Sequence, residues 1–183
     1  MRFRRSSAVL VAMALAVGAA GVREGSARGL EPAVKAAFLP KFAPYVTWPA
    51  VAVPTPGAAY VICVVGRDPF GPLIEEALSG YRVGGSPLAA RRLDRVDRNS
   101  NCHIAFLAGS SRQSVDEGLK ALRGAPVLTV TDARTGRDRG MIHFELREGR
   151  MRFHVDDAAA ARAGLGLSSK LLGLAISVEA RER

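Results

Sequence analysis

Short apolar runs recur along the middle of the chain and predict buried strands. Each is bounded by turn residues and is too short for a buried helix, which favours a strand. The runs span residues 60–65, 88–93, 102–107 and 127–131. Helices are predicted between them at 72–79 and 111–122. The alternation of strands and helices predicts an α/β domain whose sheet is at least partly parallel.

A hairpin signal follows these runs. Residues 141–146 and 151–155 alternate between apolar and polar positions, and the connection at 147–150 is polar with a glycine near its end. Such a pair of runs is typical of two antiparallel strands joined by a short turn. We therefore expect a mixed sheet.

Two short helices are predicted after the hairpin. Asp156 or Asp157 can cap a helix that runs to Ala163, because an aspartate side chain accepts hydrogen bonds from the first free amides. Ser168 can cap a last helix in the same way. Its apolar face is expected to carry Leu171, Leu172, Ala175 and Val178.

The N-terminal part of the domain predicts a helix with an apolar face. Between residues 31 and 48, Val34, Phe38 and Phe42 follow one another at helical spacing. Pro40 and Pro44 conflict with an uninterrupted helix, because each removes an amide donor and crowds the preceding turn. We expect a kink or two short helical pieces.

Together these elements predict one compact α/β domain at residues 28–183. Its sheet is expected to be mixed and mostly parallel, with about five to six strands flanked by helices in a Rossmann-like arrangement. Residues 1–27 predict a secretory signal peptide, since the basic segment 2–5 precedes an uncharged run at 8–20 that is shorter than the roughly 20 residues needed to span a bilayer. Small residues offer cleavage points near Ala20 and after Ala27. An uncleaved anchor is the alternative.

The chain is basic, with a formal net charge of +9 at pH 7. Its Lys and Arg residues form no extended run, and no aromatic residues are interleaved with them. This pattern does not support nucleic-acid binding, and the predicted export of the chain argues further against it. We interpret the charge as a solvated basic surface.

The only two cysteines, Cys63 and Cys102, are expected to form a disulfide. An exported chain with an even cysteine count favours a crosslink, and both residues lie in apolar runs expected to be neighbouring buried strands. Closing a loop of about 40 residues stabilises a fold by roughly 4 kcal/mol in the chain-entropy model. A structural role alone is enough to explain the disulfide.

The segment 66–71 has the glycine spacing of a phosphate-binding loop. A proline and a leucine stand at 72–73, where such a loop needs a lysine and a hydroxyl. Pro69 offers no amide, and Asp68 places negative charge beside a phosphate. We interpret the segment as a turn from a strand into a helix.

Other candidate chemistry is weaker. His103 follows Cys102, but adjacent strand residues point to opposite faces, so no Cys–His pair is expected. His143 and His154 are expected opposite each other in the hairpin; without a third ligand we favour solvated strand residues over a metal pair. The segment 168–170 suits helix capping better than a Ser–Lys nucleophile. We assign local turn hydrogen bonding to Asp94, Asp97, Asp132, Asp138, Asp156 and Asp157. The sequence predicts no catalytic residue, no cofactor and no metal site.

Several segments in a fixed order carry a family resemblance. They are 34–49, 61–71, 102–110, 126–132 and 140–175. An opening aromatic helix ends in Trp48-Pro49, an Asp-Pro-Phe-Gly turn at 68–71 follows the first strand, and a Ser-Ser-Lys-Leu-Leu helix at 168–172 closes the pattern. In this order and spacing the chain resembles the YfiR-like family of periplasmic proteins.

The resemblance implies a non-enzymatic periplasmic repressor. Such a protein binds the periplasmic sensing part of an inner-membrane diguanylate cyclase and so controls cyclic-di-GMP signalling. The resemblance also implies a homodimer, and it implies no direct insertion into the membrane after signal cleavage. Cys63 and Cys102 match one cysteine pair of the family. A second family pair is absent here, so a redox-sensing role is not carried over. Pro40 and Pro44 depart from the family's continuous helix, so no partner contact is carried over either. The alternative is a periplasmic protein that binds a small ligand in the crevice of the mixed sheet.

Overall fold

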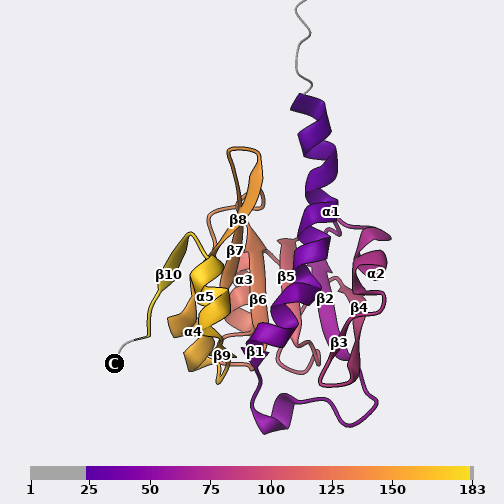
Figure 1. Cartoon of the computed structure of the whole chain (residues 1–183), viewed down its shortest axis with the longest axis vertical. Coiled ribbons are helices and arrows are strands. Elements are labelled where there is room, and N and C mark those ends of the chain that lie inside the picture. The colour runs from indigo at the N-terminus through magenta and orange to yellow at the C-terminus, as the bar shows by residue number, and fades with distance from the viewer. Residues whose placement is uncertain (1–23, 182–183) are drawn as a thin grey trace, which may run out of the picture.

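A computed structural model describes residues 24–181 as an eight-stranded sheet with helices on both faces, beside a small two-stranded sheet (Figure 1). The strands are β1 (Val46–Thr47), β2 (Tyr60–Gly66), β3 (Arg82–Val83), β4 (Ser86–Leu93), β5 (Ile104–Gly109), β6 (Leu128–Asp132), β7 (Ile142–Arg147), β8 (Arg150–Asp156), β9 (Gly166–Leu167) and β10 (Ser177–Glu179). The α-helices are α1 (Glu24–Phe42), α2 (Leu73–Leu78), α3 (Val115–Ala121), α4 (Asp157–Arg162) and α5 (Ser169–Leu174), and short 3-10 helices span Ala43–Tyr45 and Ala50–Ala52.

The large sheet is mixed and mostly parallel, as predicted. Its strand order is β10-β8-β7-β6-β5-β2-β4-β3. The pairs β4–β2, β2–β5, β5–β6 and β6–β7 are parallel, whereas β7 and β8 form the predicted antiparallel hairpin. All six predicted strands are present. The strand count rises to eight because β3 and β10, of two and three residues, pair along the two edges.

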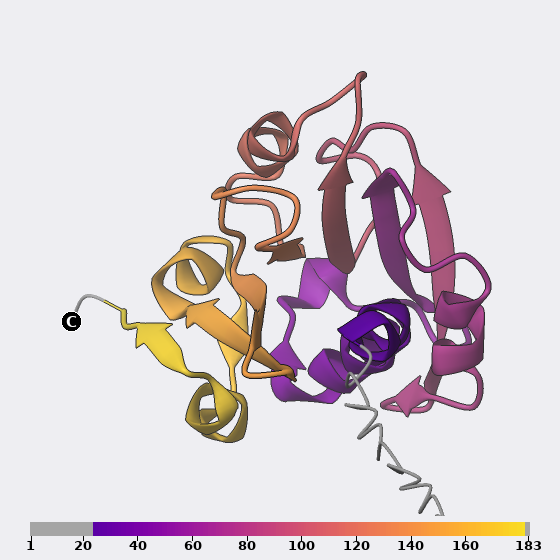
Figure 2. The ribbon, with the colours of Figure 1, turned by 90° about the horizontal axis from the view of Figure 1, so that it is seen from above.

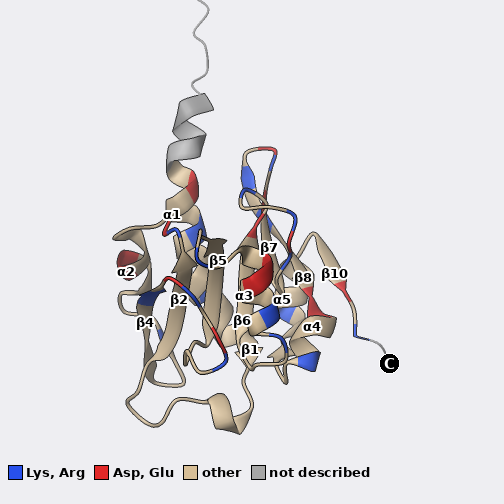
Figure 3. Cartoon of the chain, turned by 180° about the vertical axis from the view of Figure 1, so that it is seen from behind, with Lys and Arg blue, Asp and Glu red and all other residues tan. Residues whose placement is uncertain are grey.

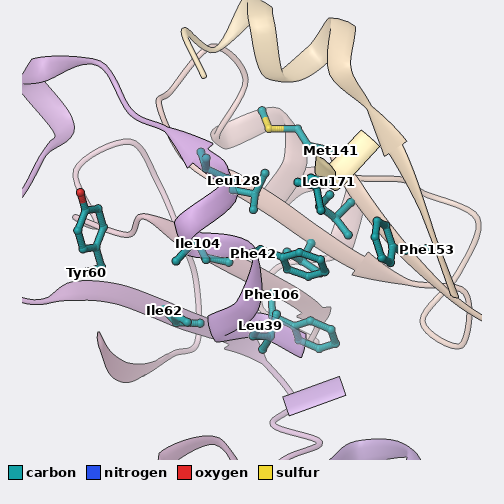
Figure 4. Close-up of a cluster of buried hydrophobic side chains, with 14 of the residues drawn as sticks. Leu39, Phe42, Tyr60, Ile62, Ile104, Phe106, Leu128, Met141, Phe153 and Leu171 are labelled. Carbon is teal, nitrogen blue, oxygen red and sulfur yellow. The ribbon is translucent and has the colours of Figure 1, made fainter. Parts of the chain in front are cut away.

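The central strands are buried on both faces, which explains their unbroken apolar runs. Every residue of β6 is buried, and so are Ile62 to Val65 of β2. Side chains of successive residues point to opposite faces, so one strand serves two cores. Ile62 and Val64 join the larger core beneath α1, while Cys63 and Val65 join a smaller core beneath α3. Figure 2 shows α1 and α3 on opposite sides of the sheet, and Figure 4 shows side chains of the larger core.

Helix α1 packs its aromatic face across the sheet. Leu39 and Phe42 are fully buried, and the Phe42 ring contacts those of Phe144 and Phe153 with centroids 5.8 and 5.5 Å apart. The helix begins at Glu24 and continues through Pro40, so the predicted break does not fall there. Burial of the apolar face stabilises the helix enough to offset the missing amide, because packing contributes most of a helix's stability in a protein. The α-helix gives way to a 3-10 turn just before Pro44.

Several predicted boundaries were wrong. Helix α3 begins at Val115 and not at residue 111, because Ser114 and Glu117 form a capping box. Helix α5 ends at Leu174, and Val178 lies in β10, where its backbone pairs with β8. Strand pairing there overrides the helical spacing of the apolar residues. Strand β5 begins at Ile104, so Cys102 lies just outside it.

Residues 1–23, and with them most of the predicted signal peptide, lie outside the described residues. The peptide and its cleavage after Ala27 stay a prediction. Within residues 24–181, no helix combines the length and the apolar character needed to cross a membrane.

Candidate interaction sites

The disulfide joins strand β2 to the residues that lead into its parallel neighbour β5. Cys63 lies in the middle of β2 and Cys102 two residues before β5, with their Cα atoms 5.8 Å apart. Arg91 of β4 lies over the bond, and its guanidinium nitrogen is 3.7 and 3.8 Å from the two Sγ atoms. The His103 ring instead packs against Tyr60 in the opposite core. Neither cysteine therefore has a histidine base beside it, and the bond crosslinks the sheet.

The glycine-framed segment after β2 is a tight turn into α2. The Asp68 carboxylate accepts hydrogen bonds from the amides of Phe70 and Gly71 at 2.7 and 3.2 Å, and it pairs with Arg92 at 2.7 Å. Two amides that a phosphate would need are thus already used within the turn. Gly66 is required for a different reason. It has a φ of +88°, and a side chain there would lie 2.4 Å from the carbonyl oxygen of Gly109.

A cleft opens at the carboxyl ends of β2, β5 and β6, under the N-terminal half of α1. Its volume is about 490 Å³. Its lining residues are Glu31, Pro32, Lys35, Arg67, Asp68, Pro69, Phe106, Ala108, Asp132, Arg134 and Thr135. After β2 the chain crosses to β4 on one side and returns to β5 on the other, so this is the point where the strand order reverses. Ligands of open α/β sheets bind at such points.

A buried ion cluster forms one wall of the cleft. The Lys35 ammonium contacts the carboxylates of both Glu31 and Asp132, and all three residues are at most 6% exposed. Arg134 donates to the second oxygen of Glu31 at 2.7 Å. Burial by itself raises the pKa of Glu31, but the hydrogen bonds from Lys35 and Arg134 outweigh it and hold that pKa below its usual value. The cluster fastens α1 to the end of β6.

Sequence reasoning missed this cluster. The Asp132 carboxylate does make the predicted turn hydrogen bond, accepting from the Arg134 amide at 3.1 Å, but its ion pair with Lys35 is not predicted from the sequence. A signal was available: Glu31 and Lys35 are four residues apart on a helix that also carries the apolar face, and Asp132 directly follows a fully buried strand. Figure 3 shows acidic and basic residues together on α1 and in the loops beside it.

The two hairpin histidines lie opposite each other, as predicted, but they are not both solvated. His143 is buried, and its Nδ1 lies 2.8 Å from the Thr131 hydroxyl. Burial, followed by the nearby charges of Arg139 and His154, lowers the pKa of His143. His154 bonds to Glu145 at 2.7 Å. No group of three or more metal-ligating side chains occurs within the part of the chain that the structure describes.

Ser168 acts as a helix cap. Its hydroxyl accepts a hydrogen bond from the Leu171 amide at 3.3 Å, at the start of α5. Because this bond satisfies a free amide of the first turn, it accounts for the hydroxyl without a catalytic role.

An apolar groove of about 360 Å³ lies between the end of α1, β8 and α5. Phe38, Tyr45 and Phe153 line it, and Leu174 at its rim is 62% exposed. Exposed apolar surface of this kind is available for contact with other molecules.

The fold and these sites define a crosslinked α/β domain with surfaces suited to binding. The chain belongs to the YfiR/HmsC-like family, whose model matches residues 32–176. The match covers both cysteines, every residue that lines the cleft except Glu31, and every strand of the large sheet except β10. A comparison with curated proteins finds no match to this chain.

Proposed function

We propose that the chain is a periplasmic regulatory protein. It binds the periplasmic sensing part of an inner-membrane diguanylate cyclase, represses the enzyme and so controls cyclic-di-GMP signalling. The observation that carries this proposal is the YfiR/HmsC-like family match over residues 32–176, which spans nearly the whole described domain. The mature protein is exported and acts without catalytic residues of its own.

Repression by such a protein is a matter of differential binding. A partner shifts a receptor between two conformations only by the difference between its affinities for them. The structure supports this mode of action, because two features make the domain rigid: the disulfide between β2 and the residues just before β5, and the ion cluster between α1 and the end of β6. A rigid domain loses little conformational entropy when it binds a partner.

Binding is tested with the purified mature protein and the diguanylate cyclase of the same cell. We expect the protein, immobilised, to retain the full-length cyclase from solubilised membranes. A cyclase that lacks its periplasmic part should pass through, which controls for binding to the rest of the enzyme. If both forms are retained equally, or neither is, the proposed interaction is wrong.

The cleft favours a second candidate function, the binding of a small ligand. It lies where the strand order reverses and its volume of about 490 Å³ falls within the roughly 300–1,000 Å³ typical of ligand pockets. Thermal stabilisation of the isolated protein by a small molecule, without any protein partner, would favour this function. The two functions are compatible, since a ligand in the cleft would contact both α1 and the strand ends.

A further inference from the structure

The carboxylates that line the cleft are already neutralised within the protein. Glu31 and Asp132 share the Lys35 ammonium, and Glu31 also pairs with Arg134. The third carboxylate, Asp68, pairs with Arg92 and accepts two amides of its own turn. None of the three is therefore free to hold a cation.

Arg67 is the exception among the charged residues of the cleft. Its guanidinium makes no ion pair or side-chain hydrogen bond with any residue between 30 and 181, the range over which the structure describes side chains, and it is exposed at the cleft wall. Arg134 uses one nitrogen for Glu31 and leaves its other donors available. The cleft thus offers guanidinium donors and no free carboxylate.

The two arginines stand on either side of one strand end. Arg67 directly follows β2 and Arg134 follows β6, while β5 runs between these strands and contributes Phe106 and Ala108 to the lining. Neighbouring strands are about 4.8 Å apart, so the two strands that these arginines follow are separated by roughly 10 Å. Side chains of this length can approach one anion from both sides.

Apart from Thr135, the uncharged residues of the lining are apolar. The rings of Pro32 and Pro69 and the methyl group of Ala108 border the same space and are at least partly exposed, whereas the Phe106 side chain is fully buried. An inorganic anion would leave this surface uncovered, whereas a ligand with an apolar body would cover it and remove it from water. Guanidinium groups bind carboxylates through two parallel hydrogen bonds.

From these observations we propose that the cleft is a binding site for a small organic acid, whose carboxylate is held by Arg67 and Arg134 and whose apolar body lies against Pro32, Pro69 and Ala108. The proposal rests on the ligand-binding function and is independent of the cyclase interaction. It names the ligand by its chemistry: one carboxylate and an apolar group that fits beneath α1.

Phenylacetate is a suitable probe, tested on the mature protein by calorimetry and by its effect on the melting temperature. We expect saturable binding in the micromolar to low millimolar range, a rise in melting temperature, and no comparable effect from 2-phenylethanol, which lacks the charge, or from acetate, which lacks the ring. Arg67→Gln should weaken binding about tenfold or more, and Arg67→Lys should restore it only in part, because lysine keeps the charge without the planar fork.

Arg112→Gln is the matched control. Arg112 is an exposed arginine that pairs with Asp94 outside the cleft, so its loss changes the net charge equally. Its affinity for phenylacetate should stay within about twofold of the wild-type value. Three results would each overturn the proposal. The first is an equal rise in melting temperature with phenylacetate and with inorganic phosphate. The second is an equal loss of affinity for phenylacetate in the Arg67 and Arg112 variants, and the third is the absence of saturable phenylacetate binding. Because no cyclase is present, such a failure leaves the regulatory function standing.

Discussion

The replacement of Lys35 by methionine tests the ion cluster that fastens α1 to the sheet. Lys35 is 4% exposed, and its ammonium lies between the carboxylates of Glu31 and Asp132. Methionine keeps a flexible apolar stem of similar length but removes the charge. The variant would leave two carboxylates buried near each other, of which only Glu31 keeps a cation, from Arg134.

Removal of one partner from a buried ion pair costs about 3–5 kcal/mol. The remaining pair with Arg134 places Lys35→Met at the lower end, about 3 kcal/mol in the free energy of unfolding. For a domain of this size that corresponds to a fall in melting temperature of roughly 6–12 °C. Urea unfolding at pH 7 measures the change, and the single tryptophan, Trp48, is a buried fluorescence reporter.

Lys120→Met is the matched control. Lys120 also pairs with a carboxylate four residues away, Asp116, but its side chain is 62% exposed. An exposed pair of this kind contributes about 0.3–0.5 kcal/mol, so its loss should be small. A loss below about 1 kcal/mol in Lys35→Met, or equal losses in the two variants, would refute the reasoning.

The same variant has a predicted pH dependence. In the wild-type protein the folded-state pKa of Glu31 lies below its usual value, because the hydrogen bonds from Lys35 and Arg134 outweigh the effect of burial. A lowered carboxylate pKa contributes stability above the unfolded-state pKa of about 4.3, and that contribution is lost as the pH falls through the folded-state pKa. The stability difference between wild type and Lys35→Met should therefore hold down to about pH 4.3 and narrow only below it, as the wild-type carboxylate becomes protonated.

Three further predictions concern other parts of the fold. Replacing Cys63 and Cys102 together by alanine should cost about 4 kcal/mol in urea unfolding, since the bond closes a loop with a sequence separation of 39; two titratable thiols in the native periplasmic protein would contradict it. Gly66→Ala should cost at least about 2 kcal/mol in the free energy of unfolding, because the new side chain would meet a carbonyl oxygen. Gly57 has a similar φ but open space around it, so the loss in Gly57→Ala measures the backbone strain alone. Equal losses in the two variants would contradict the steric reasoning. The folded-state pKa of His143 is lowered, so the neutral form stabilises the fold and the melting temperature should fall as the pH drops below about 6.5. In His143→Asn the melting temperature should depend less on pH over this range. If the dependence is unchanged, His143 is not its cause.

Local patterns in the sequence predicted most of the fold. The six longer strands and the caps at Asp156 and Ser168 follow from short-range periodicity and side-chain chemistry, and the structure confirms them. Edge pairing is a different matter: Val178 lies in β10 because the neighbouring β8 offers free backbone groups, which the residues around Val178 do not reveal.

The cleft could not be predicted from local patterns. Its central contact joins Lys35 to Asp132, residues 97 positions apart, and the pair with Arg134 reaches 103 positions from Glu31. Such contacts depend on which helix crosses which strand end. The order of the strands, with β2 between β4 and β5, creates the site, and the sequence specified the strands without fixing that order.

The most direct test of the regulatory function is the rate of cyclic-di-GMP synthesis by the membrane-bound cyclase of the same cell, measured in sealed vesicles with its periplasmic side outward. Added mature protein should lower that rate in a saturable way, and deletion of the cyclase's periplasmic part should abolish the effect. A rate that does not change at any concentration of the folded, oxidised protein would contradict a repressor of this family.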